Sequence, residues 1–298
     1  MGASSGIVEE RFIFDTVFGI NALNKSGIPM ENIRILIDSQ GQDALRQKLS
    51  SLLGIENVEL CGTISLERLL LEEKNYKSLV FFINGHGNHE CLMAEIPIKP
   101  SVLIKYIKNA THFERAVVYL GQCFAGIFNY QPVAKIDNEG CDIVIVGATN
   151  LSASISISTS ENFGLERVSW VANLFLMGLF VWFQHPIDID GDDRLTVADS
   201  YKFAGSYVNR ALHTGNKNTF PNLLVDLVQA VTKYKNLTIE KNRKKFYVGG
   251  VELVDLPIEL EQKAMREKID NLSSQVAILL NRQEAWILNA IPAQQIEY

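Results

Sequence analysis

Short, uninterrupted apolar segments alternate with amphipathic segments through the first half of the chain. The apolar segments have the length and the branched side chains of buried strands, and they are Ile33–Ile37, Leu79–Ile83, Ala116–Leu120 and Ile143–Val146. The amphipathic segments have apolar residues at helical spacing, and they are Phe12–Asn24, Gln42–Leu53, Leu66–Glu73 and Pro100–Lys108. Strands without polar alternation, separated by helices, are typical of a parallel sheet covered on both faces. The pattern predicts an α/β fold with three layers, in which a mostly parallel central sheet lies between helices.

The second half of the chain has a different pattern. Phe246–Asp255 is expected to form strands around a turn at Gly249-Gly250, because a Gly-Gly pair suits a hairpin. Leu260–Ala290 contains neither Gly nor Pro and is expected to be helical. These features predict one domain over residues 1–255 and a C-terminal amphipathic helical extension over residues 256–298.

One apolar segment, Trp170–Phe183, has to be weighed as a membrane helix. It is shorter than the ~20 apolar residues that a membrane span requires, and polar residues flank it. We therefore expect this segment to be a buried core helix and the protein to have no membrane partner.

The composition is that of a folded globular protein, with 298 residues of which 47% are hydrophobic and 21% charged. The chain has 28 Lys and Arg against 34 Asp and Glu, and this net charge of −6 argues against a nucleic-acid partner. Its 4 cysteines include no CxxC pair, so neither a disulfide framework nor a zinc ribbon is indicated. No signal peptide is visible. We expect a cytoplasmic protein in a reducing compartment.

Two of the expected strands end in residues that can perform chemistry. The strand ending at Ile83 is followed by His86, and the strand ending at Leu120 is followed by Cys123. Reactive groups gather at the carboxyl ends of parallel strands. An imidazole beside a thiol can take its proton, and the glycines around both residues leave backbone N–H groups free to bind an oxyanion. A buried structural cysteine and a His-Gly turn are the alternatives, and the joint placement of the two residues favours a nucleophile and its base.

Longer blocks of sequence surround these two residues. They are Val80–Gly87, Val117–Gly126, an N-terminal block from Gly2 to Leu36, and Ala148–Asn150 followed by Ser152–Ser154. In their order these blocks resemble the legumain-like and caspase-like cysteine peptidases of clan CD, which have the caspase–hemoglobinase fold, and they are closest to the legumain branch. The resemblance covers residues 2 to about 156 and is loose beyond them.

The resemblance implies a role for each matching residue. His86 would be the general base and Cys123 the nucleophile, with the N–H groups of Gly87 and Cys123 forming the oxyanion hole. Arg11 would lie in the pocket for the substrate residue before the cleaved bond (P1), and Gln122 and Ser154 would also contact substrate. A guanidinium suits an Asn or Asp side chain at P1. The alternative for Arg11 is an ion pair with Glu9 or Glu10.

The sequence also departs from the family. Phe12 replaces a pocket histidine, and Phe124 replaces an acidic residue, so the P1 pocket is expected to be more apolar than in legumains. The sequence begins where the first core strand of the family is expected to end, so either that strand is absent or the start of the sequence is truncated.

An acidic loop follows the apolar helix. Asp188, Asp190, Asp192 and Asp199 fall on ligand positions of an EF-hand loop. Position 6 of that loop is normally Gly and is Asp193 here, which needs a left-handed backbone. A structural calcium ion and a plain acidic turn are both open, and no cofactor is expected for catalysis.

The expected C-terminal helix has a heptad seam. Its positions are Met265, Ile269, Leu272, Val276, Leu279, Gln283, Trp286 and Ala290. The seam either packs against its own domain or pairs with a second copy or a partner protein.

The sequence therefore predicts a cysteine endopeptidase that cleaves proteins or peptides after Asn or Asp through an acyl-enzyme. Two alternatives remain at this stage. The chain is either a non-catalytic or regulatory protein-binding module on a peptidase scaffold, or a transpeptidase that transfers the acyl group to an amine.

Overall fold

The computed structural model describes the backbone of residues 8–56, 58–135, 140–164, 166–243, 246–248, 251–253, 255–280 and 283–298. The matching block Gly2–Gly6 and the expected turn at Gly249-Gly250 lie outside these residues. The chain divides into two compact units. The first extends to Asn209 and includes Gln283–Tyr298, and the second is Arg210–Arg282. The expected boundary at residue 255 thus lies inside the second unit.

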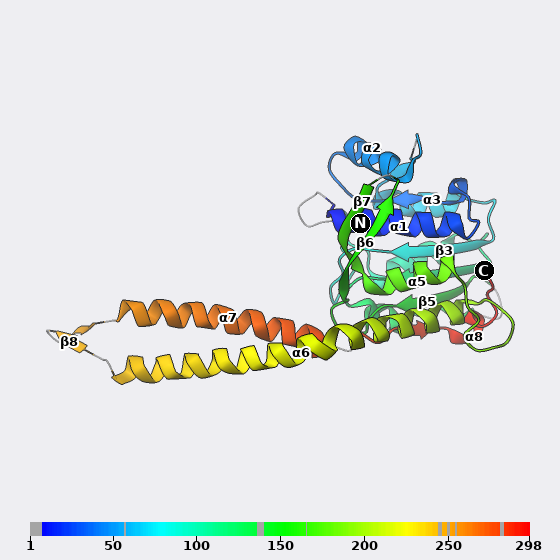
Figure 1. The fold of residues 1–298 in the computed structure, drawn as a ribbon. Helices are drawn as coiled ribbons and strands as arrows, with labels where there is room; N and C mark the ends of the chain where they lie inside the picture. The colour runs from blue at the N-terminus through cyan, green and yellow to red at the C-terminus, as the bar shows by residue number, and fades with distance from the viewer. Residues whose placement is uncertain are drawn as a thin grey trace. The chain divides into compact units, whose positions relative to one another are not determined.

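A partly parallel, open sheet forms the centre of the first unit (Figure 1). Its strands are β3 (Ser78–Ile83), β4 (Arg115–Leu120), β5 (Asp142–Gly147) and β10 (Trp286–Leu288). β3, β4 and β5 are parallel, and β10 pairs with β5 in the antiparallel direction. A separate parallel pair is formed by β1 (Ile35–Leu36) and β2 (Leu60–Cys61). The predicted α/β class and three of the apolar strands are therefore confirmed. The fourth, Ile33–Ile37, forms only β1 and is not part of the four-stranded sheet.

Helices pack on both faces of this sheet. On one face, α3 (Leu66–Glu72) and α4 (Pro100–Asn109) share an apolar cluster with alternate residues of β4 and β5. On the other face, α1 (Glu10–Lys25) packs against α5 (Leu174–Gln184). Phe82 points to this second face, where its ring stacks on Tyr119 with centroids 5.2 Å apart. Successive strand residues thus enter two different layers, as the continuous apolar strands require.

Further helices of the first unit are α2 (Gln42–Leu53), α8 (Ala290–Ala293), and three 3-10 helices, η1 (Met30–Asn32), η2 (Thr63–Ser65) and η3 (Ala125–Tyr130). The four helices expected before residue 110 are confirmed within two residues at each end by α1, α2, α3 and α4.

Two expectations about local structure are wrong. The polar stretch after residue 150 and the start of the apolar segment form an antiparallel hairpin of β6 (Ser156–Phe163) and β7 (Glu166–Asn173), so the apolar helix begins at Leu174. The C-terminal helix is not continuous to Ala290, because β10 lies within that range. Strand pairing between β10 and β5 is a long-range interaction that local helix propensity does not report.

The second unit is a helical hairpin. α6 (Val197–Arg243) contributes its later residues to this unit, and α7 (Leu256–Leu280) returns beside it, with β8 (Phe246–Val248) and β9 (Val251–Leu253) paired at the tip (Figure 1). Lys233–Glu261 and Lys241–Glu259 ion pairs join the two helices. The expected strands around residue 250 are confirmed.

The heptad seam is placed only in part on α7. Leu272 and Val276 are buried and Met265 and Ile269 are half-buried, while the side chain of Leu279 lies outside the described set. Gln283 and Trp286 belong to the first unit. Pairing of the seam with another chain stays a prediction.

Among the described helices, none combines the length and the apolar character needed to cross a membrane. α5 is the most apolar of them, and Phe175, Leu179 and Trp182 on it are fully buried against the rest of the first unit.

Candidate active site

The sheet places His86 and Cys123 at equivalent positions. Ile83 and Leu120 are register partners at the carboxyl ends of β3 and β4, and each of the two residues follows its strand end by three positions. The Gly121 N–H donates to the Ile83 carbonyl at 2.9 Å, which continues the ladder beyond the strands. The two side chains are half-buried, so both remain open to solvent. A thiol and an imidazole therefore lie on neighbouring loops at the carboxyl ends of the parallel strands.

Gly87 lies directly against the backbone of the cysteine loop. A Cβ atom at this position would approach the Cys123 carbonyl oxygen to 2.4 Å and the Gln122 Cγ to 2.6 Å, which no side chain tolerates. Within the described chain, neither the Gly87 N–H nor the Cys123 N–H donates a hydrogen bond. Two unused donors on adjacent loops are the arrangement that an oxyanion hole needs.

The cysteine loop is fixed by backbone contacts to the segment after β5. The Ser154 N–H donates to Cys123 Sγ at 3.3 Å, and the Phe124 N–H donates to the Ser152 carbonyl at 2.8 Å. Phe124 has φ of 56°, a left-handed conformation that is unusual for a bulky residue. Ser154 therefore lies next to the expected nucleophile, as the sequence predicts.

His86 has a carboxylate partner. Glu9 Oε1 lies 2.5 Å from His86 Nε2, and the Phe12 ring contacts the imidazole edge-on at 5.2 Å. The hydrogen bond from His86 holds the pKa of Glu9 below its usual range. An acceptor on Nε2 requires the proton on that nitrogen, which leaves Nδ1 to accept a proton from another group. Glu9 thereby selects the tautomer of the imidazole.

Arg11 is bound to the same carboxylate. Its Nε donates to Glu9 Oε2 at 2.7 Å, and its guanidinium lies over the Phe12 ring at 4.3 Å. The structure thus shows the ion pair with Glu9 that the sequence left as the alternative for Arg11. The side chain stays about a third exposed, at 32%. Its place in a P1 pocket stays a prediction.

Gln122 is almost fully buried at 1% exposure. Neither polar atom of its side chain has a hydrogen-bond partner in the described part of the chain. A buried amide without partners costs free energy, so its retention beside Cys123 favours a role at the site over a packing role. Contact between Gln122 and substrate stays a prediction.

A buried carboxylate connects the elements beneath the site. Asp15 on α1 accepts hydrogen bonds from Asn84 Nδ2 at 2.9 Å, Trp170 Nε1 at 2.8 Å and the Asn173 N–H at 3.2 Å. Asn173 Nδ2 in turn donates to the Gly121 carbonyl at 2.6 Å. Asn84 precedes the His86 loop and Gly121 begins the Cys123 loop, so Asp15 positions both loops through its partners.

The other thiols have different surroundings. Cys91 and Cys141 are buried, and burial raises the pKa of Cys141 to about 12. Cys61 is half-buried like Cys123 but lies at the end of β2. Cys123 lies on the loop that adjoins Gly87, and its role as nucleophile stays a prediction.

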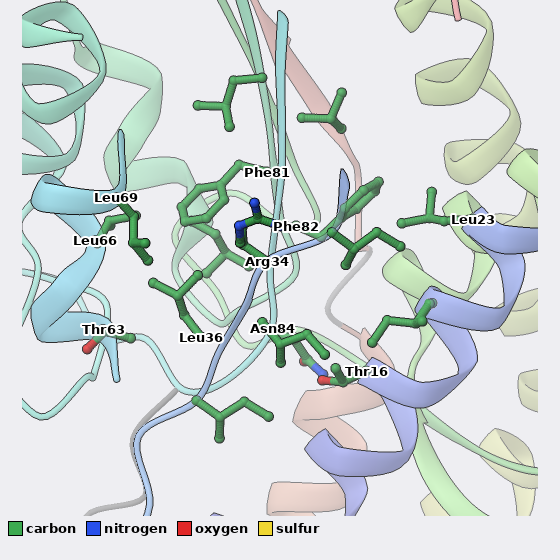
Figure 2. Close-up of a pocket in the computed structure, with 18 of the residues that line it drawn as sticks. Thr16, Leu23, Arg34, Leu36, Thr63, Leu66, Leu69, Phe81, Phe82 and Asn84 are labelled. Carbon is green, nitrogen blue, oxygen red and sulfur yellow. The ribbon is translucent and has the colours of Figure 1, made fainter. Parts of the chain in front are cut away.

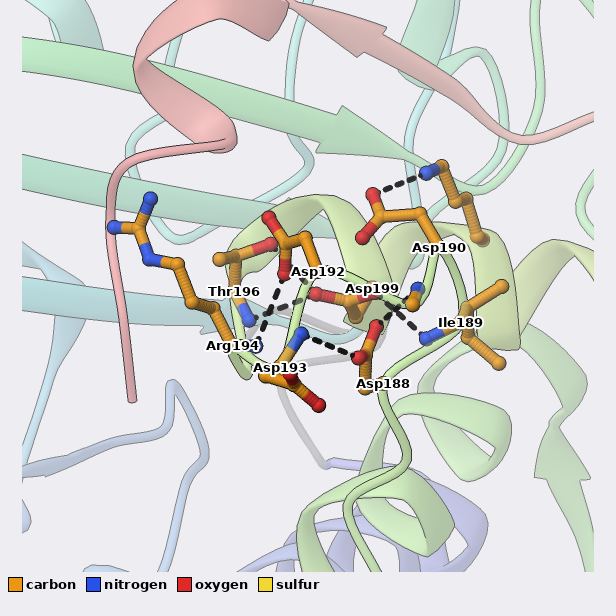
Figure 3. Close-up of polar contacts among 10 residues, drawn as sticks. Asp188, Ile189, Asp190, Asp192, Asp193, Arg194, Thr196 and Asp199 are labelled. Carbon is orange, nitrogen blue, oxygen red and sulfur yellow. Dashed lines mark hydrogen bonds and ion pairs between the residues drawn. The ribbon is translucent and has the colours of Figure 1, made fainter.

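The acidic loop is organised by its own backbone (Figure 3). Asp188 accepts from the N–H groups of Gly191 at 2.7 Å and Asp193 at 2.8 Å, and these bonds hold its pKa low. The carboxylates of Asp188, Asp190 and Asp192 lie within 4.8 Å of one another. Asp199 is not in this group, since it accepts from the N–H groups of Ile189 and Thr196. Three of the four expected ligands therefore gather, and calcium binding stays a prediction.

Asp193 has the left-handed backbone that the loop pattern requires, with φ of 62°. We expect Asp193→Gly to stabilise the protein by roughly 0.5 kcal/mol, because Gly has no Cβ and adopts this conformation without a steric penalty. The greater conformational freedom of Gly in the unfolded chain keeps this gain small. Asp193→Ala is the matched comparison and is expected to destabilise by about 1 kcal/mol. Urea denaturation of the three proteins measures both changes, and a more stable Ala variant contradicts the account.

A scan against protein-family models finds no match to the chain, and a search of curated proteins finds none either.

Three residues of this site were not predicted as part of it. Glu9 and Asp15 lie on or before an amphipathic helix where charged residues are ordinary, so no local signal marks them. In the sequence, Asn173 is a polar residue within the apolar segment Trp170–Phe183. It is the N-cap of α5, where its Oδ1 accepts from the Leu176 N–H at 3.0 Å.

Proposed function

We propose that the protein is a cysteine endopeptidase of the caspase–hemoglobinase fold, with Cys123 as nucleophile and His86 as general base. The observation that carries the proposal is the equivalent placement of the two side chains past the paired strand ends, with Gly87 against the Cys123 backbone. The legumain-like sequence blocks, which include both residues, agree with it. No cofactor takes part in the proposed reaction.

The proposed reaction assigns a role to each of these groups. His86 takes the thiol proton, and a bond forms between Cys123 Sγ and the substrate carbonyl carbon while the carbonyl electron pair moves to oxygen. The Gly87 and Cys123 N–H groups bind that oxyanion. The carbon–nitrogen bond then breaks, and His86 gives its proton to the leaving amine. Water attacks the thioester next, which releases the acid and restores the thiol.

The P1 preference is proposed from Arg11. A guanidinium about a third exposed and near His86 can bind the carboxylate or amide oxygen of an Asp or Asn side chain. Its present partner, Glu9, would share it with the substrate.

A peptide library that varies only P1 tests the proposed function. We expect hydrolysis after Asn or Asp. We expect Arg11→Ala to remove this preference by raising KM about tenfold for the peptides with Asn or Asp at P1. Arg46→Ala is the matched control, because Arg46 also forms an ion pair, with Asp43, but on α2. Hydrolysis with an unchanged preference in Arg11→Ala contradicts the pocket assignment.

Two other results of this experiment favour the alternatives. Products in which the acyl group is joined to an added amine indicate a transpeptidase. A chain that cleaves no peptide and whose Cys123 reacts with no peptidyl electrophile is a binding module, and the proposal fails.

Glu9 gives a separate prediction. We expect Glu9→Gln to lower kcat by about tenfold or more with little change in KM, because an amide no longer fixes the His86 tautomer. The Glu9 pKa is depressed in the folded state, so its contact with His86 is complete above the ordinary value of 4.5 and is lost only as the pH falls through the lower value.

The measurement is a pH profile of kcat for both proteins, with Glu10→Gln as control because Glu10 pairs with Lys48. A kcat of Glu9→Gln equal to that of the control refutes the positioning role.

A further inference from the structure

An apolar cavity of about 410 Å³ lies in the first unit, and His86 is among the residues that line it. Its wall includes every residue of β3 from Ser78 to Ile83 and every residue of Ile33–Ile37 around β1. Side chains of a strand alternate between two faces, so a cavity above one face contacts alternate residues only. Consecutive wall residues on both strands place the cavity between the two strand edges.

Both edges lack a strand partner in the described part of the chain. β3 pairs with β4 alone, and β1 pairs with β2 alone. An unpaired edge presents a row of N–H and C=O groups that can bind another strand. The cavity therefore has backbone donors and acceptors on two sides.

The other two sides are apolar. Leu66 and Leu69 of α3 lie on one side of the strands, and Leu23 of α1 lies on the other, as Figure 2 shows. Arg34 also lines the cavity, and its charge is paired with Glu73 at 2.7 Å. A strand in this position would be covered on both faces, so its residues must be continuously apolar.

One buried polar atom at the end of the cavity lacks a partner. Asn84 is 5% exposed and lines the cavity, and its Nδ2 is bound to Asp15. Its Oδ1 has no hydrogen-bond partner among the described residues. A buried acceptor of this kind calls for a donor, which the N–H of an added segment would supply.

We propose that this cavity is a docking slot for an extended, apolar segment of a partner polypeptide, which enters the sheet as a strand between β3 and β1. Recognition by added strand pairing is an established way of binding peptides. The slot takes about six residues, the length of β3, and the Asn84 carboxamide binds one end of the segment.

The test uses a labelled peptide, Lys-Lys-Val-Ile-Val-Ile-Val-Lys-Lys, and the full chain. The peptide contains no Asn or Asp, so the proposed peptidase activity does not consume it. We expect saturable binding by fluorescence anisotropy and slower hydrogen exchange at those amides of β3 that are not bonded to β4. The same peptide with N-methylated valines should not bind, since it cannot complete the backbone pairing.

Val80→Lys is the deciding variant, because Val80 lines the cavity and is 38% exposed, so the change should not prevent folding. We expect it to weaken peptide binding by about tenfold or more. Val171→Lys is the matched control, with an exposed valine of β7 that is not in the cavity wall.

Three results would overturn the proposal. The first is no binding, or equal binding by Val80→Lys and Val171→Lys. The second is binding that leaves unprotected the amides of β3 that are not bonded to β4. The third is protection of those amides without peptide, which assigns the slot to a second copy if the chain elutes as a dimer and to the chain's own residues if it elutes as a monomer.

Discussion

Removing the Cys123 thiol in Cys123→Ala is expected to lower kcat/KM for peptide hydrolysis by about 10⁴-fold or more. The nucleophile is then absent, while the loop contacts of Phe124 and Gly126 to the segment after β5 remain. The fold should therefore survive. Single-turnover assays with the best library substrate measure the loss, and circular dichroism checks the fold.

Cys61→Ala is the matched control for this variant. Cys61 is a free, half-buried thiol like Cys123, so its loss tests whether any accessible cysteine supports cleavage. We expect its activity to equal that of the parent. Retained cleavage in Cys123→Ala, or lost cleavage in Cys61→Ala with an intact fold, contradicts the assignment of the nucleophile.

Asp15→Asn is expected to destabilise the protein by about 3 kcal/mol and to lower activity as well. The Asp15 carboxylate accepts three hydrogen bonds from buried donors, and an amide has one oxygen for them. A buried donor without an acceptor costs about 1–3 kcal/mol. Activity falls because Asn84 and Asn173, which position the two loops, lose their common partner.

The pH dependence of this effect has a definite sign. Burial raises the pKa of Asp15 above its ordinary value of 3.8, so the folded protein keeps this proton to a higher pH than the unfolded chain does. Between the two values the folded state binds more protons, and the free energy of unfolding decreases as the pH rises. Asp15→Asn has no group that titrates here. The difference in the free energy of unfolding between the parent and Asp15→Asn should therefore become smaller as the pH rises through that interval.

Urea denaturation at several pH values measures this difference. Asp43→Asn is the control, because Asp43 pairs with Arg46 at the surface and its loss should cost less than about 1 kcal/mol. Equal stability of Asp15→Asn and Asp43→Asn would show that the buried network adds nothing.

Local patterns were sufficient to predict the central strands and the helices that cover them. β4 and β5 are fully buried and hold only apolar residues at their centres, so their continuous apolar runs identify them directly. The hairpin of β6 and β7 was missed because only two residues of β6, Ile157 and Phe163, are large and apolar. β10 was missed because its pairing with β5 joins residues more than 130 positions apart.

The candidate site likewise has residues that local sequence patterns identify and residues that depend on long-range contacts. His86 and Cys123 follow strands that the sequence predicts, so their proximity follows from the order of the strands. Glu9 approaches His86 across 77 positions, and Asp15 reaches Trp170 across 155. No spacing rule reports contacts of this range, which depend on how α1 packs against α5 and β7.

The return of the chain to β5 also determines when the site is completed during synthesis. Trp286 packs on Gly147, where any Cβ would approach the indole to 2.3 Å, and the Gln283 side chain accepts from the Ile155 N–H beside Ser154. Both residues are made after the whole of α6 and α7. A nascent chain therefore leaves the outer edge of β5 open, and the Ile155 N–H without its Gln283 acceptor, until residue 286 has been synthesised and has left the ribosome. The proposed peptidase would assemble its site only at that late stage of translation.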